Sequence, residues 1–230
     1  MNLLDDPRPA VQHRAIETLA GKDEGAIALL AQMVAPDRSV NARRNAVWTA
    51  TRIDHPAARV VIAAGLLYPD ETVRQVAIHA VSLRRDQETV PALVLLLHNP
   101  SLQNRRAAAE ALGRIGDRAA VPELLKALGE LSAPDRTLGE LSAPDRTLEH
   151  SLTYAFIEIG DPRGAAKGLR NAGSRTRRAA LVALDQMNGG GLDPVQAAAL
   201  LTASDPHRFH PRTDPDLAAH NSPSRPSLWK

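Results

Sequence analysis

The sequence predicts an all-α protein, an α-solenoid of about six stacked helix-turn-helix repeats with a period of about 31 residues. Two observations favour this class: one position recurs at that spacing, and hydrophobic residues make up 43% of the chain while aromatic residues make up only 3%. Small aliphatic side chains suit close helix packing better than β-sandwiches or barrels. Because a two-helix unit cannot bury both faces alone, neighbouring units must stack.

A position inside each candidate first helix marks the repeat. Four alanines lie 31 residues apart, and two more units follow after 44 and 28 residues; the repeat positions are Ala15, Ala46, Ala77, Ala108, Leu152 and Ala180. Proline stands eight residues earlier in four of the units, at Pro7, Pro69, Pro100 and Pro144. A pattern that recurs at one phase indicates a repeat array.

The first helix of each unit is expected to carry that proline in its first turn, where a missing N–H costs nothing. An acid or asparagine beside it is expected to act as a cap or first-turn acid: Asp6, Asp37, Asp70, Asn99 and Asp145. The apolar stripe over residues 73–81 predicts one buried face. Trp48 and Tyr154 fall inside first helices and are expected to be packing residues.

The second helix of each unit is expected to be shorter and more apolar. Turn signals precede it at Gly21, His55-Pro56, Gly116-Asp117 and Gly160-Asp161-Pro162. The segments VPALVLLL from Val90 and VPELLKAL from Val121 are examples of such helices.

The segment AAAEALGRIGDRAAVPELLKAL, residues 107–128, resembles the short HEAT-like repeat first associated with phycobilisome lyases. The resemblance extends over residues 1 to about 201, and it implies the solenoid fold. Segments RTLEHSLTYAFIEIGD and ALDQMNGGGLDP are similar to HEAT regions of planctomycete membrane-bound dehydrogenase and haem-binding proteins. Since this chain has no CxxCH motif, neither redox activity nor haem follows from that similarity.

Two irregularities set the expected domain boundaries. The segment GELSAPDRTL, residues 129–138, is repeated at 139–148, and the extra copy is expected to form a loop inserted into a solenoid of residues 1–201. Ten extra helical residues would rotate the following face, and two prolines interrupt the insert. Residues 202–230 are proline-rich without apolar periodicity, so we expect a disordered tail. The ends suggest a segment of a larger array that can self-associate.

Composition excludes several kinds of site and leaves the location open. With no cysteine, disulfides, thiolate metal sites and cysteine nucleophiles are impossible, and a formal charge of +2 does not require a nucleic-acid or lipid partner. The N-terminus does not read as a signal peptide, and apolar runs of about eight residues cannot span a bilayer. The chain is therefore expected to be soluble and cytoplasmic as written, or periplasmic within an exported parent.

No catalytic, cofactor or metal site is expected. The pair His207 and His210, in an HxxH pattern, falls in the proline-rich tail, and the His-Glu dipeptides of di-iron HEAT-repeat hydroxylases are absent, with only the reversed Glu149-His150. Asn188 and the three glycines after it lack the Lys and Ser/Thr of a phosphate loop and are expected to form a turn.

Arginines at one phase of the first helices are the candidate functional residues. They are Arg43, Arg44, Arg74, Arg105, Arg106, Arg177 and Arg178. Stacking would place them in a row about 10 Å apart, and guanidinium groups can bind carboxylates or phosphates in bidentate fashion. The alternative, given more weight, is that each arginine pairs with an acid or with a helix C-terminal carbonyl of an adjacent unit.

The favoured function is a non-catalytic scaffold, part of a larger bacterial protein, whose second helices line a concave face that binds another protein. One alternative is a bilin lyase-type subunit that holds a tetrapyrrole in that face; the second helices offer few polar groups for it. A lesser alternative is contact with the DNA backbone, while the scarcity of aromatic residues argues against single-strand recognition.

Overall fold

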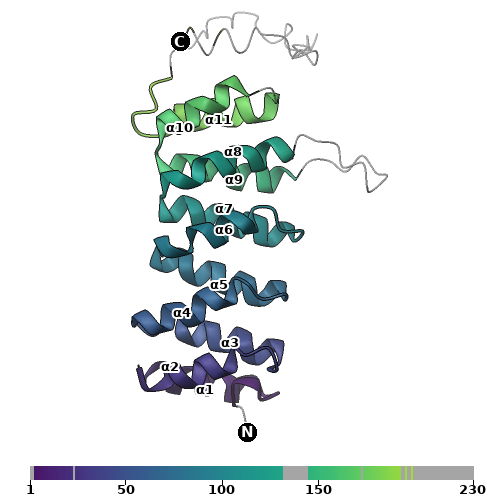
Figure 1. Ribbon diagram of the computed structural model, residues 1–230, viewed down its shortest axis with the longest axis vertical. Helices are drawn as coiled ribbons and strands as arrows, with labels where there is room; N and C mark the ends of the chain where they lie inside the picture. The colour runs from purple at the N-terminus through teal and green to yellow at the C-terminus, as the bar shows by residue number, and fades with distance from the viewer. Residues whose placement is uncertain are drawn as a thin grey trace, which may run out of the picture.

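The structure is a computed structural model that describes residues 3–22, 24–131, 145–171 and 173–192, together with Val195 and Ala198. Over these residues the chain is helical, with no β-strand (Figure 1). None of the described helices is long and apolar enough to cross a membrane. The predicted all-α solenoid is confirmed.

First and second helices alternate along the chain. The first helices are α1 (Pro9–Ala20), α3 (Val40–Ala50), α5 (Glu71–Arg84), α7 (Leu102–Ile115), α9 (Arg146–Ile159) and α11 (Ser174–Gln186). The second helices are α2 (Glu24–Met33), α4 (Pro56–Gly65), α6 (Val90–Leu96), α8 (Val121–Glu130) and α10 (Pro162–Lys167). Short 3-10 helices, η1 to η4, cover Leu3–Asp5, Gln87–Thr89, Arg118–Ala120 and Gly168–Arg170.

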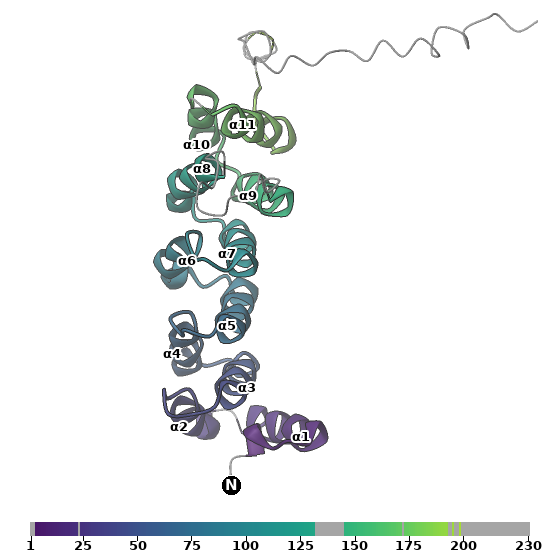
Figure 2. The same ribbon diagram turned by 90° about the vertical axis from the view of Figure 1, so that its right-hand side faces the viewer.

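The helices form two columns, one of first helices and one of second helices (Figure 2). Each first helix packs directly on the next, from α1 through α11, whereas α4, α6 and α8 make little contact with one another. The two columns share one continuous hydrophobic core. The repeat interface is therefore made chiefly by the first helices.

Small residues allow the first helices to approach closely. The repeat positions Ala46, Ala77, Ala108 and Leu152 are fully buried, and Ala180 is nearly so. At Gly113 of α7, a Cβ in place of the hydrogen would lie only 2.9 Å from the Cα of Ala155 in α9. Helices can approach this closely only where no side chain intervenes, so the alanine-rich composition is a requirement of the stack.

The recurring prolines before α5 and α7 do not lie in the first turn as predicted; each is two residues before the first helical residue. Pro69 and Pro100 each precede the N-cap residue, which is Asp70 and Ser101 respectively; Pro144 lies outside the described residues. An N-cap residue has an extended backbone, and its side chain accepts from an N–H two or three residues later. Because a capping residue stands directly after the proline, the helix begins after that residue and the proline is left outside the first turn. Proline occupies the first turn mainly in the second helices.

The acids expected to act as caps divide into two groups. Asp70 and Asp145 do cap helices, each accepting from two backbone N–H groups. The other three do not: Ser39 caps α3 in place of Asp37, Asn99 accepts from the backbone N–H of the capping Ser101, and Asp6 accepts from Arg8. Neighbouring serines thus supply two of the expected caps.

The stack continues across the duplicated segment. Gly129 and Glu130 still belong to α8, and Arg146 to Leu148 already belong to α9, which packs on α7 as the other first helices do on their neighbours. Residues 132–144 lie outside the described residues, as do residues 202–230. The inserted loop and the disordered tail therefore stay predictions.

Candidate functional site

The seven candidate arginines do not form one row; they separate into two columns with different surroundings. The first, which we call the joint column, comprises the hydrogen-bond donors three positions before the repeat position, where only α9 has an acid, Glu149; the donors are Gln12, Arg43, Arg74, Arg105 and Arg177. Each donates to a backbone carbonyl in the link that precedes its own helix. The second column comprises Arg44, Arg106 and Arg178, one residue further along.

Distances in the joint column are short. Arg43 Nη2 donates to Arg38 O at 2.7 Å, Arg105 Nε to Leu97 O at 2.7 Å, and Arg177 Nη1 to Asn171 O at 2.9 Å. Carbonyls near a helix C-terminus have no partner inside the helix and carry partial negative charge. These arginines therefore tie the exit of one second helix to the start of the next first helix.

Arg74 is the most connected member of the joint column. Its Nη1 donates to Tyr68 O and Pro69 O, both at 2.6 Å. With the buried Asn104 amide turned so that its oxygen faces Arg74, that oxygen accepts from Arg74 Nε at 2.8 Å and the amide nitrogen donates to Glu71 O at 3.3 Å. One guanidinium group thus joins the link between α4 and α5 to α7.

The second column lies on the outer surface of the first helices. We define the first-helix face by the residues two positions before and two after the repeat position in α3 to α11. These side chains are exposed or half-buried: Arg44, Trp48, Gln75, His79, Arg106, Glu110, His150, Tyr154, Arg178 and Val182. This face therefore combines three arginines with aromatic and imidazole rings and one acid, Glu110.

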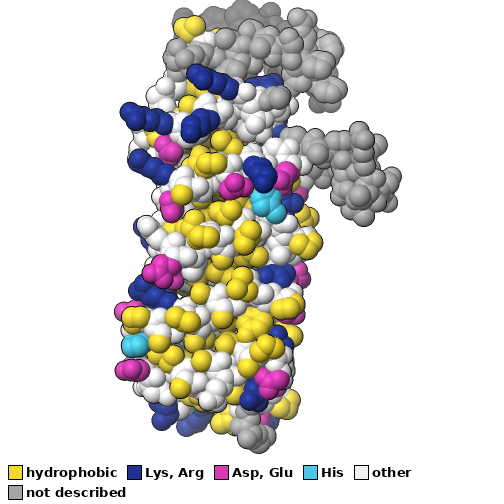
Figure 3. Space-filling view, in the orientation of Figure 1, with side chains coloured by type: hydrophobic (Ala, Val, Ile, Leu, Met, Phe, Trp, Pro, Cys, Tyr) yellow, Lys and Arg dark blue, Asp and Glu magenta, His cyan; other side chains and the backbone are white. Residues whose placement is uncertain are grey.

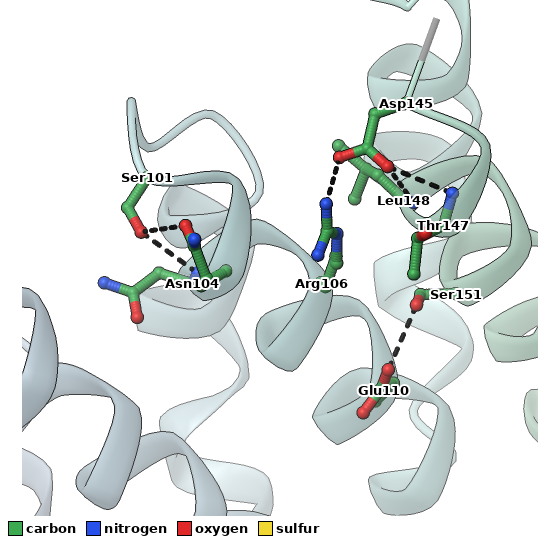
Figure 4. Close-up of polar contacts among 9 residues, drawn as sticks. Ser101, Asn104, Arg106, Glu110, Asp145, Thr147, Leu148 and Ser151 are labelled. Carbon is green, nitrogen blue, oxygen red and sulfur yellow. Dashed lines mark hydrogen bonds and ion pairs between the residues drawn. The ribbon is translucent and has the colours of Figure 1, made fainter.

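Two arginines of this face are paired with acids of the same chain. Arg106 Nη2 lies 2.6 Å from Asp145 Oδ2, and Arg178 Nη2 lies 2.6 Å from Glu149 Oε1. Figure 4 shows the Arg106 pair beside a second contact between α7 and α9, in which Ser151 Oγ donates to Glu110 Oε1 at 3.0 Å. Polar contacts thus join adjacent repeats on the outer surface.

Asp145 is held in its charged form. Burial by itself would raise the pKa of this carboxyl, but the hydrogen bonds from Arg106 and from the backbone N–H groups of Leu148 and Thr147 outweigh it, and the pKa lies below its usual value. Both N–H donors are 3.0 Å away. The charge of Arg106 is therefore largely balanced within the chain.

The prediction that Trp48 and Tyr154 are packing residues is wrong. Trp48 is 36% exposed and Tyr154 is 46% exposed, on the first-helix face. The Trp48 ring stacks on His79 with centroids 6.1 Å apart, and Tyr154 stacks on His150 at 6.3 Å. The aromatic residues fall on the solvent side because they stand two positions after the repeat position, away from the helix interface.

Three hollows open between neighbouring first helices. The one between α3 and α5 has a volume of about 410 Å³, the one between α5 and α7 about 230 Å³, and the one between α9 and α11 about 530 Å³. Arg146, Glu149, His150, Arg175 and Arg178 are among the residues that line the last of these. Side chains of the first-helix face line all three hollows.

The second helices do not line the concave side, contrary to the prediction. The column of first helices is bowed, with its ends displaced outward from its middle, while the column of second helices is nearly straight (Figure 2). Closer packing through alanine and glycine bends the stack toward the first helices. The second-helix face instead presents apolar side chains over α2, α4 and α6, with Val60 and Leu95 both 71% exposed (Figure 3).

A further hollow of about 810 Å³ lies at the α1–α2 end and is lined mainly by apolar side chains such as Leu3, Val11, Leu29 and Met33. Self-association through the solenoid ends stays a prediction.

Among the described residues, no group of three or more His, Cys, Asp or Glu side chains is arranged to hold a metal. His207 and His210 lie outside the described residues, and the chain from 188 to 189 forms a turn after α11.

Comparison with solved structures supports the fold. Among them, the complex of CpcE and CpcF of phycocyanin lyase from Nostoc sp. PCC7120 matches with a TM-score of 0.51 and 22% identity, over 76% of this chain and 68% of that one. A designed armadillo repeat protein in complex with the peptide (KR)4 matches with a TM-score of 0.48 and 17% identity, over 81% and 97% of the two chains.

No curated protein matches the chain in sequence. The family model for HEAT repeats matches residues 1–82 and 67–143, which together cover more than half of the sequence. This match agrees with the structure, in which two-helix units stack through their first helices. The chain therefore belongs to the HEAT repeat proteins.

Proposed function

We propose that this chain is a non-catalytic scaffold that binds a segment of a partner protein along the first-helix face. The observation that carries the proposal is the exposure of aromatic and arginine side chains on that face, above hollows between the helices. Trp, Tyr and Arg are the residue types enriched where protein interfaces gain most of their binding energy.

The shape of the face supports an extended partner segment. The side chains of the first-helix face recur with the repeat, so they present similar positions at regular intervals along a bowed surface. An extended peptide can place successive side chains over successive hollows. A regular surface of this kind favours a linear segment over a globular partner.

The bilin lyase-type alternative has less support. A tetrapyrrole site needs polar groups that converge on one place, and the second-helix face where we expected one is largely apolar over α2 to α6 (Figure 3). The likeness to a phycocyanin lyase complex concerns the fold.

The DNA alternative is also weakened by the charges. Backbone binding requires arginines that are free to contact phosphates. Arg43, Arg74 and Arg105 instead donate to backbone carbonyls of the chain, and Arg106 and Arg178 pair with carboxylates.

A displayed library of random peptides tests the proposal. Peptides selected on the whole chain would be measured by fluorescence anisotropy against the chain and two variants, Tyr154→Ser on the first-helix face and Leu95→Ser on the second-helix face. We expect Tyr154→Ser to weaken binding about tenfold, a loss typical of an exposed aromatic anchor, and Leu95→Ser to leave it unchanged. Selected peptides that respond only to Leu95→Ser, or a library without binders, would refute it.

A further inference from the structure

The hollow between α3 and α5 differs from the other hollows of the first-helix face in its charge. Its lining consists of Arg44, Trp48, Thr72, Gln75, Val76 and His79, with no acidic residue. The hollow between α5 and α7 contains Glu110, and the one between α9 and α11 contains Glu149. Only the α3–α5 hollow among these three lacks a carboxylate of its own.

Two guanidinium groups, that of Arg44 in the lining and that of Arg52 over the Trp48 ring, have no acidic partner among the described residues. Arg44 Nη2 donates to the neutral amide oxygen of Asn41 at 2.8 Å. The guanidinium of Arg52, one turn beyond Trp48, lies 5.5 Å from the centre of the indole ring. Arg106 and Arg178, at the position equivalent to Arg44 in other repeats, are each balanced by a carboxylate of the chain. The positive charge at α3 is therefore left for a partner to balance.

An apolar surface adjoins these charges. The indole of Trp48 stacks on His79 at an interplanar angle of 23°, and Val76 lies in the same hollow. Trp48 is held in place by its contacts with His79 and Arg52 while 36% of it stays exposed. A rigid, half-buried indole contacts an apolar side chain at little cost in conformational entropy.

We infer that the α3–α5 hollow is the docking site for an acidic segment of a partner protein, with a large apolar side chain against Trp48 and carboxylates on Arg44 and Arg52. The inference rests on the proposed function and adds the chemistry of the partner. A guanidinium can bind a carboxylate through two parallel hydrogen bonds, and a basic partner would be repelled. The charge of the hollow thus selects the sign of the partner.

The test uses Trp48 as its own reporter. The chain contains two tryptophans, so replacing Trp229 with Phe leaves the emission of Trp48 alone. Three short peptides without aromatic residues are titrated: one alternates Asp and Glu with Leu, one has Lys at every acidic position, and one has Gln there. Each is measured at low and at physiological salt, because an exposed charge contact weakens as salt is added.

Arg44→Gln and Arg52→Gln are the test variants, and Arg59→Gln, on the exposed side of α4, is the matched control. We expect only the acidic peptide to change the emission of Trp48 at a saturating concentration. Each test variant should weaken its binding about two- to fivefold, the range for exposed ion pairs, and the double variant about tenfold. The control should bind unchanged, and far-ultraviolet circular dichroism should show that all variants are folded.

The outcomes separate this inference from the proposed function. Equal binding of the Lys or Gln peptide, or an equal loss in Arg59→Gln, would overturn the inference. So would library peptides that depend on Tyr154 but are insensitive to Arg44→Gln and Arg52→Gln; in that case the scaffold function stands and the acidic partner does not. If no peptide of either set depends on any residue of the first-helix face, both fail.

Discussion

Replacing Gly113 with alanine tests whether close approach of the first helices holds the stack together. In an exposed helix this substitution stabilises a protein by about 1 kcal/mol, because glycine loses more backbone entropy on folding. At Gly113 the new Cβ would lie 2.9 Å from Ala155 Cα and 3.3 Å from Ala155 Cβ in α9. The nearest atom, Glu158 Oε2 at 2.7 Å, belongs to a flexible side chain that can move aside, but Ala155 Cα is backbone, so a rotamer change cannot relieve that contact.

The size of the effect follows from these contacts. Overpacking of a well-packed interface costs about 1–3 kcal/mol, and contact with backbone belongs in the upper part of that range. After subtracting the helix-propensity gain, we expect Gly113→Ala to lower the free energy of unfolding by about 1–2 kcal/mol. For a chain of this size that corresponds to a fall in melting temperature of about 2–8 °C.

Gly129→Ala is the matched control, since a Cβ at this position of α8 would meet nothing within 4 Å. It should raise stability by about 0.5 kcal/mol, at the lower end of the range because Gly129 is in the last turn. Urea unfolding followed by the helical circular dichroism signal compares the two variants. The reasoning is refuted if Gly113→Ala shifts the urea midpoint upward as Gly129→Ala does, because the repeat contact would then have room for a side chain.

Three further predictions concern the polar contacts. Arg74→Met should lower the free energy of unfolding by about 2–3 kcal/mol, because it removes charged hydrogen bonds to Tyr68 O and Pro69 O; urea titration checks it, with Arg59→Met as the neutral control. The hydrogen bond from the Arg8 side chain lowers the pKa of Asp6 from its usual 3.8 to about 2, so its stabilising effect should be complete above about pH 4 and lost as the pH falls toward 2. The urea midpoint should therefore show that loss in the native chain and not in Asp6→Asn; a parallel decline in both would contradict it. Asp145→Ala removes the cap of α9 and the Arg106 pair, which should cost about 1–2 kcal/mol and speed amide hydrogen exchange at the start of α9; unchanged exchange there would show that the cap is dispensable.

The architecture could be predicted from the sequence because periodicity reports burial directly. The repeat positions Ala46, Ala77 and Ala108 are fully buried, and a residue that must be small once per unit leaves a regular trace in the sequence. Helix starts were harder to predict. Proline and a capping side chain occur side by side in these links, and only backbone dihedral angles decide which of them begins the helix.

The functional face could be predicted only in part, because a shift of one residue along a helix rotates a side chain by about 100°. Arg43 and Arg44 are neighbours in the sequence, yet the first bonds to a link carbonyl and the second lies on the first-helix face. Whether a helix is on the concave or convex side depends on how closely neighbouring units approach. That is a property of pairs of helices, and no single repeat displays it.

The two arginine columns follow from one requirement of a solenoid. Backbone carbonyls in the link after a second helix lie beside the next first helix, and in the links before α3, α5, α7 and α11 an arginine three residues before the repeat position donates to one of them. That position is constrained in nearly every repeat by the fold. The positions two before and two after the repeat position bond to no link carbonyl, and their contacts with neighbouring repeats lie on the outer surface. They can differ between repeats without loss of stability, as Arg44, Gln75 and His150 do, and differences confined to one face are what a surface needs in order to recognise a particular partner segment.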